Sequence, residues 1–431
     1  MLVVGGIIGS GIFLNPSIVA RRAGTAGLTI GSWALGAVIA LLGAFIFAEL
    51  GRRRPQVGGG YAYLRDAFGA LPAFLYGWAL LLAIATGAIA AVAVTFANYA
   101  TRLVGLPSNG LTVAAIALAS VGVLSIVNVL GVQPGATTQN VFTVLKLSAL
   151  AALLLAAFFA PSAAAAPVTP ALATPEHPGG LLLALSTALV PVLFSYGGWQ
   201  QTNFVAEELR EPERTLPRAL VLGVLIVVVV YLGANVAYLR TLGVAGLGAS
   251  TAPAADLMSM VAGERGRRLI AAGIAASTFG FLDLVILVSP RVYQAMARDG
   301  LFFASFARLH PRFRTPVTAI VFQAIVAAAL SLTGSYGQLL DGVVFADWIF
   351  FGTTALTLIV FRRRDARSGM PDTGFRAPFY PVSIALFVLA SVYVVFGSIA
   401  SNPGNALRGV LLLVAGVPVF AFWNRRNHRT S

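Results

Sequence analysis

The sequence predicts an all-α membrane protein that crosses the bilayer about twelve times. Of its 431 residues, 58% are hydrophobic and only 10% are charged, whereas soluble domains are near half apolar and a quarter charged. Apolar windows of about twenty residues, the length of a helix that spans a bilayer, recur along the whole chain. We therefore expect one transmembrane domain over residues 1–431 and no soluble domain.

The expected membrane helices follow one another with short connections. They lie near residues 1–20, 27–51, 70–101, 111–130, 136–160, 179–206, 217–239, 268–293, 316–334, 339–361, 378–400 and 406–424. Residues 161–178 are rich in alanine and proline and are expected to form an extended loop. Residues 207–217 alternate in charge and are expected to form a short helix or turn that Pro217 caps.

The arginines predict the orientation of the chain in the membrane. If the amino terminus is cytoplasmic, 20 of the 28 arginines lie in cytoplasmic segments, as the positive-inside rule requires. Arg265, Arg267 and Arg268 are exceptions in a short outer loop. The net charge of +14 thus belongs to the loops of a membrane protein, and nucleic acid is not an expected partner. Both termini are expected in the cytoplasm.

The composition excludes several kinds of chemistry. The chain has no cysteine, which excludes disulfides and thiolate metal sites. His177, His310 and His428 lie in different connections or in the tail, so no metal site is expected. No catalytic constellation is apparent at membrane depth, and we predict neither an enzyme nor a bound cofactor. Among membrane proteins other than enzymes, a transporter, a sensor and a channel all remain open at this point.

Four glycines, Gly5, Gly6, Gly9 and Gly11, interrupt the first apolar segment. A membrane helix satisfies its backbone through continuous hydrogen bonds, so such a cluster indicates either close helix packing or a backbone unwound around a ligand. We favour unwinding. About eight residues precede the break, while half a bilayer needs roughly ten, and a truncated or misassigned amino terminus would give so short a start.

A second interruption falls at Gly197 and Gly198, inside the sixth apolar segment. Transporters built from inverted repeats place broken helices at corresponding positions of the two repeats. In a five-plus-five arrangement the first and sixth segments correspond, which predicts one repeat over residues 1–160, a second over 179–361 and two extra helices over 378–424. A helix-packing face at these glycines is the competing explanation.

The two breaks have the chemistry of a site for a zwitterion. Unwinding at residues 9–11 frees backbone amides at the start of a half-helix, whose positive dipole end suits a carboxylate. Freed carbonyls near Ile7 and Ile8, and at Phe194 and Ser195, can accept hydrogen bonds from an ammonium. The backbone then recognises the part that all amino acids share.

Lys146 is the only lysine among the 29 basic residues. An ammonium in an apolar helix is costly unless it is paired or solvated, so we interpret this residue as functional. It is expected to bridge carbonyls near Gly5 and Gly6 to the hydroxyl of Ser277 or Thr278. The alternative is that the side chain snorkels to the cytoplasmic interface.

Asp283, in the eighth apolar segment, is a second ionisable residue at membrane depth. Three interpretations stay open for it: a pocket wall that favours cationic side chains, a proton carrier, and a structural carboxylate that pairs with an arginine or faces a water-filled vestibule. Glu207 and Glu208, followed by Arg210 and Arg214, are interpreted as a charge network on the inner side.

Several motifs, in order along the chain, resemble those of a known superfamily. They are Gly-Ser-Gly-Ile-Phe at 9–13, Phe-Ala-Glu-Leu-Gly at 47–51, Gly-Gly-Gly-Tyr-Ala-Tyr-Leu at 58–64, Phe-Ser-Tyr-Gly-Gly-Trp at 194–199, Asn-Phe-Val-Ala-Glu-Glu at 203–208 and Leu-Pro-Arg-Ala at 216–219. Together they resemble the amino acid-polyamine-organocation (APC) superfamily, and within it most closely the L-type amino acid transporter (LAT) branch and its bacterial relatives. The resemblance extends from the first residue to about the tenth segment.

The resemblance implies a LeuT-like fold and alternating access for amino acids. It implies that the amides of Ser10 and Gly11 bind the substrate carboxylate. It also implies that the carbonyls of Ile7, Phe194 and Gly197 bind the substrate amine, with the Phe194 ring as an outer gate.

Two further matches come from the same resemblance. Lys146 matches a family lysine that occupies the place of sodium in sodium-coupled relatives. Asp347 and Trp348 resemble an amide-aromatic pair near the pocket, which makes Trp348 a candidate second layer of the pocket wall. Eukaryotic members use a cysteine to bond a glycoprotein partner, and the lack of cysteine here rules out a disulfide-linked heavy chain.

The sequence therefore predicts a sodium-independent amino acid transporter in the plasma membrane, the inner membrane of a bacterium. An exchanger of neutral amino acids is the favoured form, with the amino acid and the lipid bilayer as its expected partners. The alternative is a proton-coupled symporter of amino acids, amines or polyamines, with Asp283 or Lys146 as the titrating group.

Overall fold

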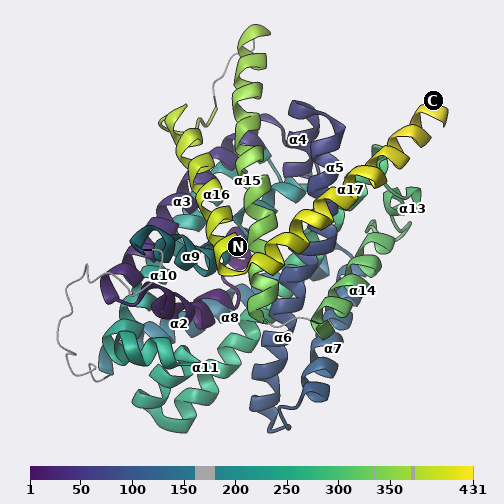
Figure 1. Cartoon of the computed structure of the whole chain (residues 1–431). Helices are drawn as coiled ribbons and strands as arrows, with labels where there is room; N and C mark the ends of the chain where they lie inside the picture. The colour runs from purple at the N-terminus through teal and green to yellow at the C-terminus, as the bar shows by residue number, and fades with distance from the viewer. Residues whose placement is uncertain (161–179, 334–335, 370–373, 431) are drawn as a thin grey trace.

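The computed structural model describes residues 1–160, 180–333, 336–369 and 374–430, and all regular structure in these ranges is helical (Figure 1). Within them, ten helices are long and apolar enough to cross a membrane, and Val317–Leu332 is a shorter apolar helix. The predicted all-α membrane class is confirmed. The count of twelve crossings stays a prediction, and the expected loop over residues 161–178 falls outside the described part of the chain.

The first half of the chain forms eight α-helices. They are α1 (Leu2–Ile7), α2 (Gly11–Ala23), α3 (Ala26–Arg53), α4 (Gly60–Phe68), α5 (Ala70–Ala79), α6 (Ala85–Val104), α7 (Gly110–Val129) and α8 (Val132–Phe159). A π-helical turn, η1 (Leu80–Ile84), joins α5 to α6 into one continuous span.

The described residues from 180 onward form nine α-helices and one 3-10 helix. They are α9 (Gly180–Tyr196), η2 (Trp199–Glu208), α10 (Pro212–Ala249), α11 (Pro253–Val288), α12 (Pro290–Arg298), α13 (Ala304–Ala307), α14 (Val317–Thr333), α15 (Tyr336–Arg367), α16 (Val382–Ser401) and α17 (Pro403–Thr430). In Figure 1, α17 runs past the rest of the bundle to the carboxyl end of the chain.

One boundary predicted from the sequence is wrong. Pro217 caps no helix but lies inside α10, which begins at Pro212. Its missing N–H costs one hydrogen bond to the carbonyl of Glu213, and that carbonyl is close to the exposed helix start, where water can replace the bond. The backbone of α11 is not helical at Ala262 and Gly263, so the part of α11 that holds the eighth span begins just after Gly263, a few residues before the predicted start near 268.

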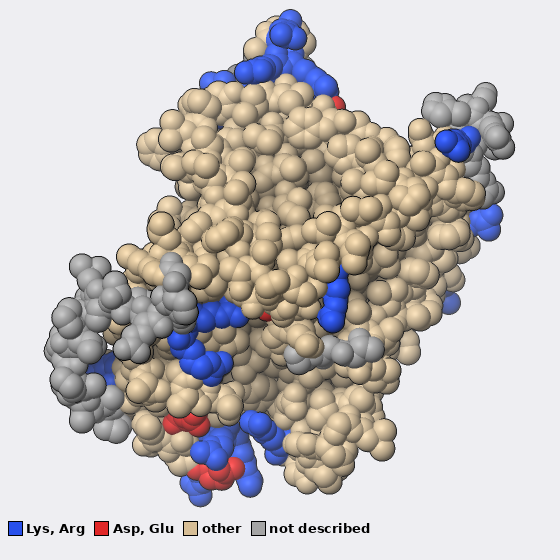
Figure 2. Space-filling model, in the orientation of Figure 1, with Lys and Arg blue, Asp and Glu red and all other residues tan. Residues whose placement is uncertain are grey.

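The outer surface of the bundle is apolar, as expected of helices in contact with lipid. Leu111, Leu155 and Phe159 are among the large apolar side chains that are exposed on α7 and α8. Charged side chains gather toward the upper and lower ends of the face drawn in Figure 2, and the band between them is almost wholly uncharged. This distribution fits a molecule whose middle lies in a bilayer.

The interior is formed by helices that pack around the first and sixth segments. α2 packs along α9, α3 along α10, and α8 along α11. This arrangement buries four pieces in the middle of the bundle, away from lipid: the end of α1, the start of α2, the end of α9, and η2. Irregular backbone at membrane depth is tolerated where protein surrounds it in this way.

Glu49 joins α3 to α15 at the end of the bundle that holds most arginines. Its carboxylate is fully buried and accepts hydrogen bonds from Arg53 Nε at 2.7 Å, Arg362 Nε at 2.9 Å and the Ala377 backbone amide at 2.7 Å. A buried carboxylate with these partners is structural, since its removal leaves Arg362 without a counter-charge, whereas Arg53 keeps Asp365 at 2.6 Å.

Replacing Glu49 with glutamine is expected to lower stability by about 3 kcal/mol, because the largely buried Arg362 loses its counter-charge. Thermal unfolding of the purified protein in detergent measures the change. Glu264→Gln is the matched control, since Glu264 forms only an exposed pair with Arg268 at 3.4 Å and such pairs contribute little. Equal melting temperatures for the two variants would contradict the structural role of Glu49.

Candidate substrate site at the two broken helices

The first membrane segment is broken between α1 and α2. α1 ends at Ile7, Ile8 is extended, and α2 begins at Gly11. Among the described residues, the backbone amides of Ser10 and Gly11 donate no hydrogen bond. They are therefore free N–H groups at the start of a helix, the position at which a carboxylate binds most readily.

The second break separates α9 from η2 at Gly197 and Gly198. Gly198 has a φ of +103°, a conformation that glycine adopts without strain. A Cβ added to Gly198 would lie 2.1 Å from the carbonyl oxygen of Gly6. The two breaks are therefore in direct backbone contact, so close packing and unwinding, proposed as alternatives from the sequence, occur together here.

A second contact between the breaks lies at Gly11. A Cβ on this glycine would lie 2.5 Å from Ser195 Oγ and 2.8 Å from Ser195 Cα. Asn15 Nδ2 donates to Ser195 Oγ at 2.8 Å and to the Pro191 carbonyl at 2.9 Å. The start of α2 is thus fixed against the end of α9 by both space and hydrogen bonds.

Tyr336, at the start of α15, extends this polar group. Its hydroxyl donates to Asn15 Oδ1 at 3.2 Å and lies 3.3 Å from Ser10 Oγ. Its ring packs edge-on against Phe194, with centroids 6.1 Å apart. Neither Tyr336 nor Asn15 was predicted from the sequence, and the only signal was an asparagine in an apolar helix four residues after Gly11.

Lys146, on α8, reaches the first break. Its side chain is fully buried, and Nζ donates to the carbonyls of Gly5 at 3.0 Å and Ile8 at 2.7 Å. The snorkelling alternative is therefore wrong for this structure. Ser277 Oγ, on α11, donates to the Gly9 carbonyl at 3.1 Å and is 3.4 Å from the Ile8 carbonyl. An ammonium and a hydroxyl thus share the carbonyls that the break exposes.

Two details of this group differ from the sequence prediction. The carbonyls that bind Lys146 are those of Gly5 and Ile8, and not that of Gly6, because Gly6 packs on Gly198 instead. Thr278 Oγ1 donates only within its own helix, since it lies on a different side of α11 from Ser277.

Asp283 lies apart from the breaks, further along α11. It is buried, and Oδ1 accepts a hydrogen bond from Asn128 Nδ2 at 2.9 Å. It is also close enough to Lys146 for the two charges to interact. In the described part of the chain it forms no ion pair with an arginine, and it does not line the cavity described next. Of the interpretations given above, the proton carrier and the carboxylate that faces a water-filled vestibule stay predictions.

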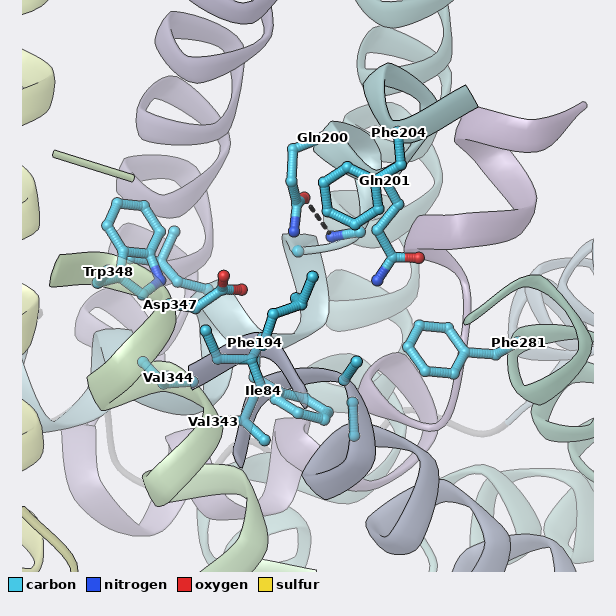
Figure 3. A pocket seen from close by; sticks show the side chains of 16 residues that line it. Ile84, Phe194, Gln200, Gln201, Phe204, Phe281, Val343, Val344, Asp347 and Trp348 are labelled. Carbon is cyan, nitrogen blue, oxygen red and sulfur yellow. Dashed lines mark hydrogen bonds between the residues drawn. The ribbon is translucent and has the colours of Figure 1, made fainter. Parts of the chain in front are cut away.

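A cavity of about 40 Å³ lies against the second break (Figure 3). Phe194, Gly197 and Trp348, all identified from the sequence, are among its lining residues. The others are Leu80, Ile84, Ala85, Ala88, Leu193, Gly198, Gln200, Gln201, Phe204, Phe281, Val343, Val344 and Asp347. This volume holds only a few water molecules, so the conformation is closed around the cavity.

The residues of the first break do not line this cavity. Phe281 lies between the two, because it lines the cavity and its ring is 3.1 Å from the position of a Cβ on Gly9. In Figure 3 the ring enters from the side opposite Trp348 and Asp347. A shift of Phe281 would therefore connect the cavity with the free amides of Ser10 and Gly11.

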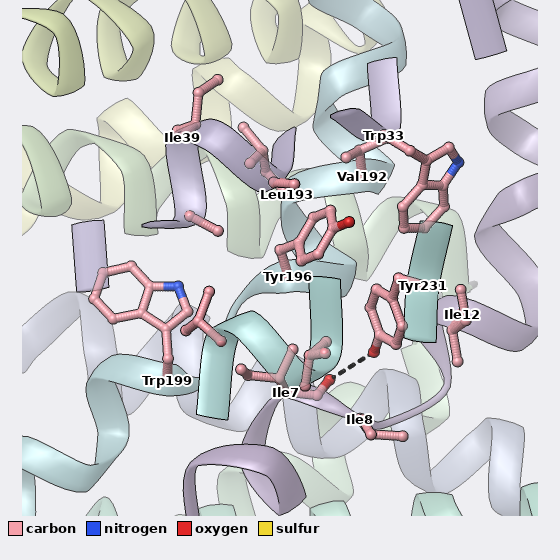
Figure 4. Close-up of a cluster of buried hydrophobic side chains, with 14 of the residues drawn as sticks. Ile7, Ile8, Ile12, Trp33, Ile39, Val192, Leu193, Tyr196, Trp199 and Tyr231 are labelled. Carbon is pink, nitrogen blue, oxygen red and sulfur yellow. Dashed lines mark hydrogen bonds between the residues drawn. The ribbon is translucent and has the colours of Figure 1, made fainter. Parts of the chain in front are cut away.

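The Ile7 carbonyl, expected to be free, has a partner. Tyr231 Oη donates to it at 3.2 Å, within a cluster that includes Trp33 and Tyr196 (Figure 4). The sequence did not identify Tyr231, because its contact with Ile7 joins residues 224 positions apart. The Ile7 carbonyl keeps one lone pair for a substrate amine, and the tyrosine fixes its direction.

These features define the class of protein. A polytopic all-helical membrane protein with two discontinuous helices, in mutual contact at mid-bundle and supported by a buried cation, is a secondary transporter. The sequence profile of the family described as Amino acid permease matches residues 1–421. The chain belongs to this family, and the resemblance to the APC superfamily is confirmed.

Several characterised relatives align with nearly the whole chain. The serine/threonine exchanger SteT of Bacillus subtilis (strain 168) is 30% identical over 430 residues, which cover 99% of this chain and 95% of SteT. The b(0,+)-type amino acid transporter 1 of Homo sapiens is 32% identical over 421 residues, 96% of this chain and 84% of the relative. The large neutral amino acids transporter small subunit 2 of Homo sapiens is 31% identical over 443 residues, which cover 99% of this chain and 79% of the relative.

Proposed function

We propose that this protein exchanges amino acids across a membrane by alternating access. The observation that carries the proposal is the contact between the two broken helices, together with the free amides of Ser10 and Gly11 and the carbonyls that the end of α1 exposes beside them. Such a pair of helix ends matches the carboxylate and ammonium of an amino acid. The relatives named above are amino acid transporters, and one of them is an exchanger.

The amides of Ser10 and Gly11 are proposed to bind the substrate carboxylate. The carbonyls of Ile7, Phe194 and Gly197 are proposed to accept from its ammonium. The Phe194 ring, which contacts Tyr336 and lines the cavity, is proposed as the outer gate. A gate at this position would close the cavity by moving one aromatic side chain against another.

Transport is proposed to be independent of sodium. A sodium ion would need the oxygens of an unwound helix as ligands, and the Lys146 ammonium already binds the Gly5 and Ile8 carbonyls. A fixed cation at this place stabilises the unwound backbone without a co-transported ion. The same ammonium, near Asp283, is the group through which a proton-coupled mechanism would act.

Neutral amino acids are the proposed main substrates, because apolar side chains dominate the walls of the cavity, among them Leu80, Ile84 and Val343.

The protein is proposed to lie in a bacterial inner membrane with both termini cytoplasmic, since most arginines then lie inside. It has no cysteine for a disulfide-linked heavy chain, and we propose that it works without one.

Exchange in proteoliposomes tests the proposal. Vesicles loaded with an unlabelled neutral amino acid are expected to take up the same radiolabelled amino acid in sodium-free buffer, while empty vesicles take up almost none. Uptake into empty vesicles that follows an imposed pH gradient would support the proton-coupled alternative. Binding without uptake under either condition would contradict transport.

A further inference from the structure

We propose that Asp347 is a specificity-determining residue that binds the positively charged end of a substrate side chain, so that the cavity also accepts amino acids ending in an ammonium. This inference rests on the proposed function, since it adds a side-chain site to the backbone site at the two breaks. It is supported by the position of Asp347, the lack of a partner for its carboxylate, and the composition of the cavity.

Asp347 lies on α15 next to Trp348 and lines the cavity. In Figure 3 its carboxyl group points into the middle of the cavity, toward the side from which Phe281 enters. Phe194 and Gly197 line the same cavity, so a substrate whose amine binds there has its side chain in the space that Asp347 faces.

The other acidic residues of α15 face an arginine, and Asp347 does not in the described structure. Asp341 Oδ1 lies 3.9 Å from Arg22 Nη2 without a hydrogen bond, and Asp365 accepts from Arg53 at 2.6 Å. Asp347 Oδ1 is closed to solvent and has no hydrogen-bond partner among the described residues, and no ion pair with Asp347 occurs there. A carboxylate at membrane depth is costly without a partner and usually marks a ligand or ion pathway.

No arginine or lysine lines the cavity, and its side-chain donors are the neutral amides of Gln200 and Gln201 and the indole of Trp348. Gln201 Oε1 also lacks a hydrogen-bond partner in the described structure. An ammonium has three donors and no acceptor, so it suits acceptors such as this oxygen and the carboxylate of Asp347. The charge of the carboxylate adds a strong attraction where water is scarce.

The remaining walls suit the stem of such a side chain. Leu80, Ile84, Val343 and Val344 are apolar and border the same space. A chain of methylene groups packs on these residues while its charged end reaches Asp347, as in other sites where lysine stems lie on apolar surfaces. The cavity must widen during the transport cycle to admit it, since its present volume is about 40 Å³.

Competition between matched amino acids tests the inference. Exchange of a radiolabelled neutral amino acid in proteoliposomes is competed with L-lysine or with L-norleucine, which has the same four-carbon stem but no ammonium. For the wild type, L-lysine is expected to compete at least as well as L-norleucine. Asp347→Asn is expected to raise the half-inhibitory concentration of L-lysine relative to that of L-norleucine by about tenfold or more.

Two variants make the result specific. Asp347→Glu, which keeps the charge, is expected to retain the wild-type ratio within about threefold, and Asp341→Asn, the same change on the same helix outside the cavity, is expected to leave the ratio unchanged.

If Asp347→Asn is inactive, thermal stabilisation of the purified variant by the two amino acids replaces the transport assay. An equal effect of Asp347→Asn on both competitors, or a wild type that excludes L-lysine, would overturn the inference. Exchange of neutral amino acids would still stand in that case, whereas a wild type that exchanges nothing would refute the proposed function itself.

Discussion

Replacing Lys146 with alanine is expected to reduce amino acid exchange by about a hundredfold or more, while the protein remains folded. The variant leaves the Gly5 and Ile8 carbonyls without the ammonium that binds them at 3.0 and 2.7 Å. A hydrogen bond to a charged group contributes about 1.5–3 kcal/mol, so the loss of two costs about 3–6 kcal/mol, which corresponds to two or more orders of magnitude in an equilibrium. Here that cost falls on the unwound backbone beside the proposed carboxylate site.

The measurement is exchange by reconstituted variants of equal purity and monodispersity. Lys146→Arg is also expected to be impaired, because a planar guanidinium has a different shape from a compact ammonium. Ser277→Ala and Thr278→Ala form a matched pair: the first removes a hydrogen bond to the Gly9 carbonyl and the second only bonds within α11. We expect a partial loss for Ser277→Ala and near wild-type exchange for Thr278→Ala. Normal exchange by Lys146→Ala would remove the basis for its role.

The sequence was informative where a feature is local. Glycine clusters at Gly9 to Gly11 and at Gly197 and Gly198 predict helix breaks, because glycine permits backbones to approach closely and adopts a positive φ without strain. The single lysine, Lys146, was a candidate on composition alone, and it contacts the first break in the structure. Such predictions need no knowledge of which helices are neighbours.

Other features of the site depend on contacts between distant segments. Tyr336 reaches Asn15 across 321 positions of the chain, and Tyr231 reaches Ile7 across 224. Side chains of this kind look like ordinary tyrosines in apolar helices, and no spacing rule connects them to a glycine break. They become recognisable only when the packing of α10 against α1 and α2, and the position of the start of α15 beside Asn15, are known.

Asp347 shows an intermediate case. The sequence places it in an apolar segment, where any carboxylate is a candidate, but Asp283 and Asp347 are equally conspicuous there. The structure separates them, since one oxygen of Asp283 accepts a hydrogen bond from Asn128 and the residue lies outside the cavity, while Asp347 lines the cavity and has no described hydrogen-bond partner. The distinction depends on the partners of each carboxyl group, which hydropathy does not report.

Replacing Gly198 with alanine is expected to abolish exchange and to lower stability by about 3 kcal/mol or more. The added Cβ would lie 2.1 Å from the Gly6 carbonyl oxygen and 2.7 Å from its carbon, and both atoms belong to the backbone and cannot rotate away. The φ of +103° at Gly198 adds strain for any residue with a side chain. The two broken helices would therefore have to separate, which displaces the carbonyls and amides of the proposed site from one another.

Two further glycines divide this effect into its parts. Gly105→Ala has the unfavourable φ of +69° with no described atom within 4 Å of the new Cβ, so it should cost only about 1 kcal/mol and leave exchange intact. Gly6→Ala meets a movable Leu284 side chain at 2.7 Å and the Gly198 carbonyl oxygen at 3.0 Å, so an intermediate loss is expected. Thermal unfolding and exchange measured on the three variants should rank Gly198→Ala as the most damaging and Gly105→Ala as the least. If Gly198→Ala behaved like Gly105→Ala, the positive φ alone would explain why residue 198 is a glycine. Contact between the two breaks would then not be required for transport.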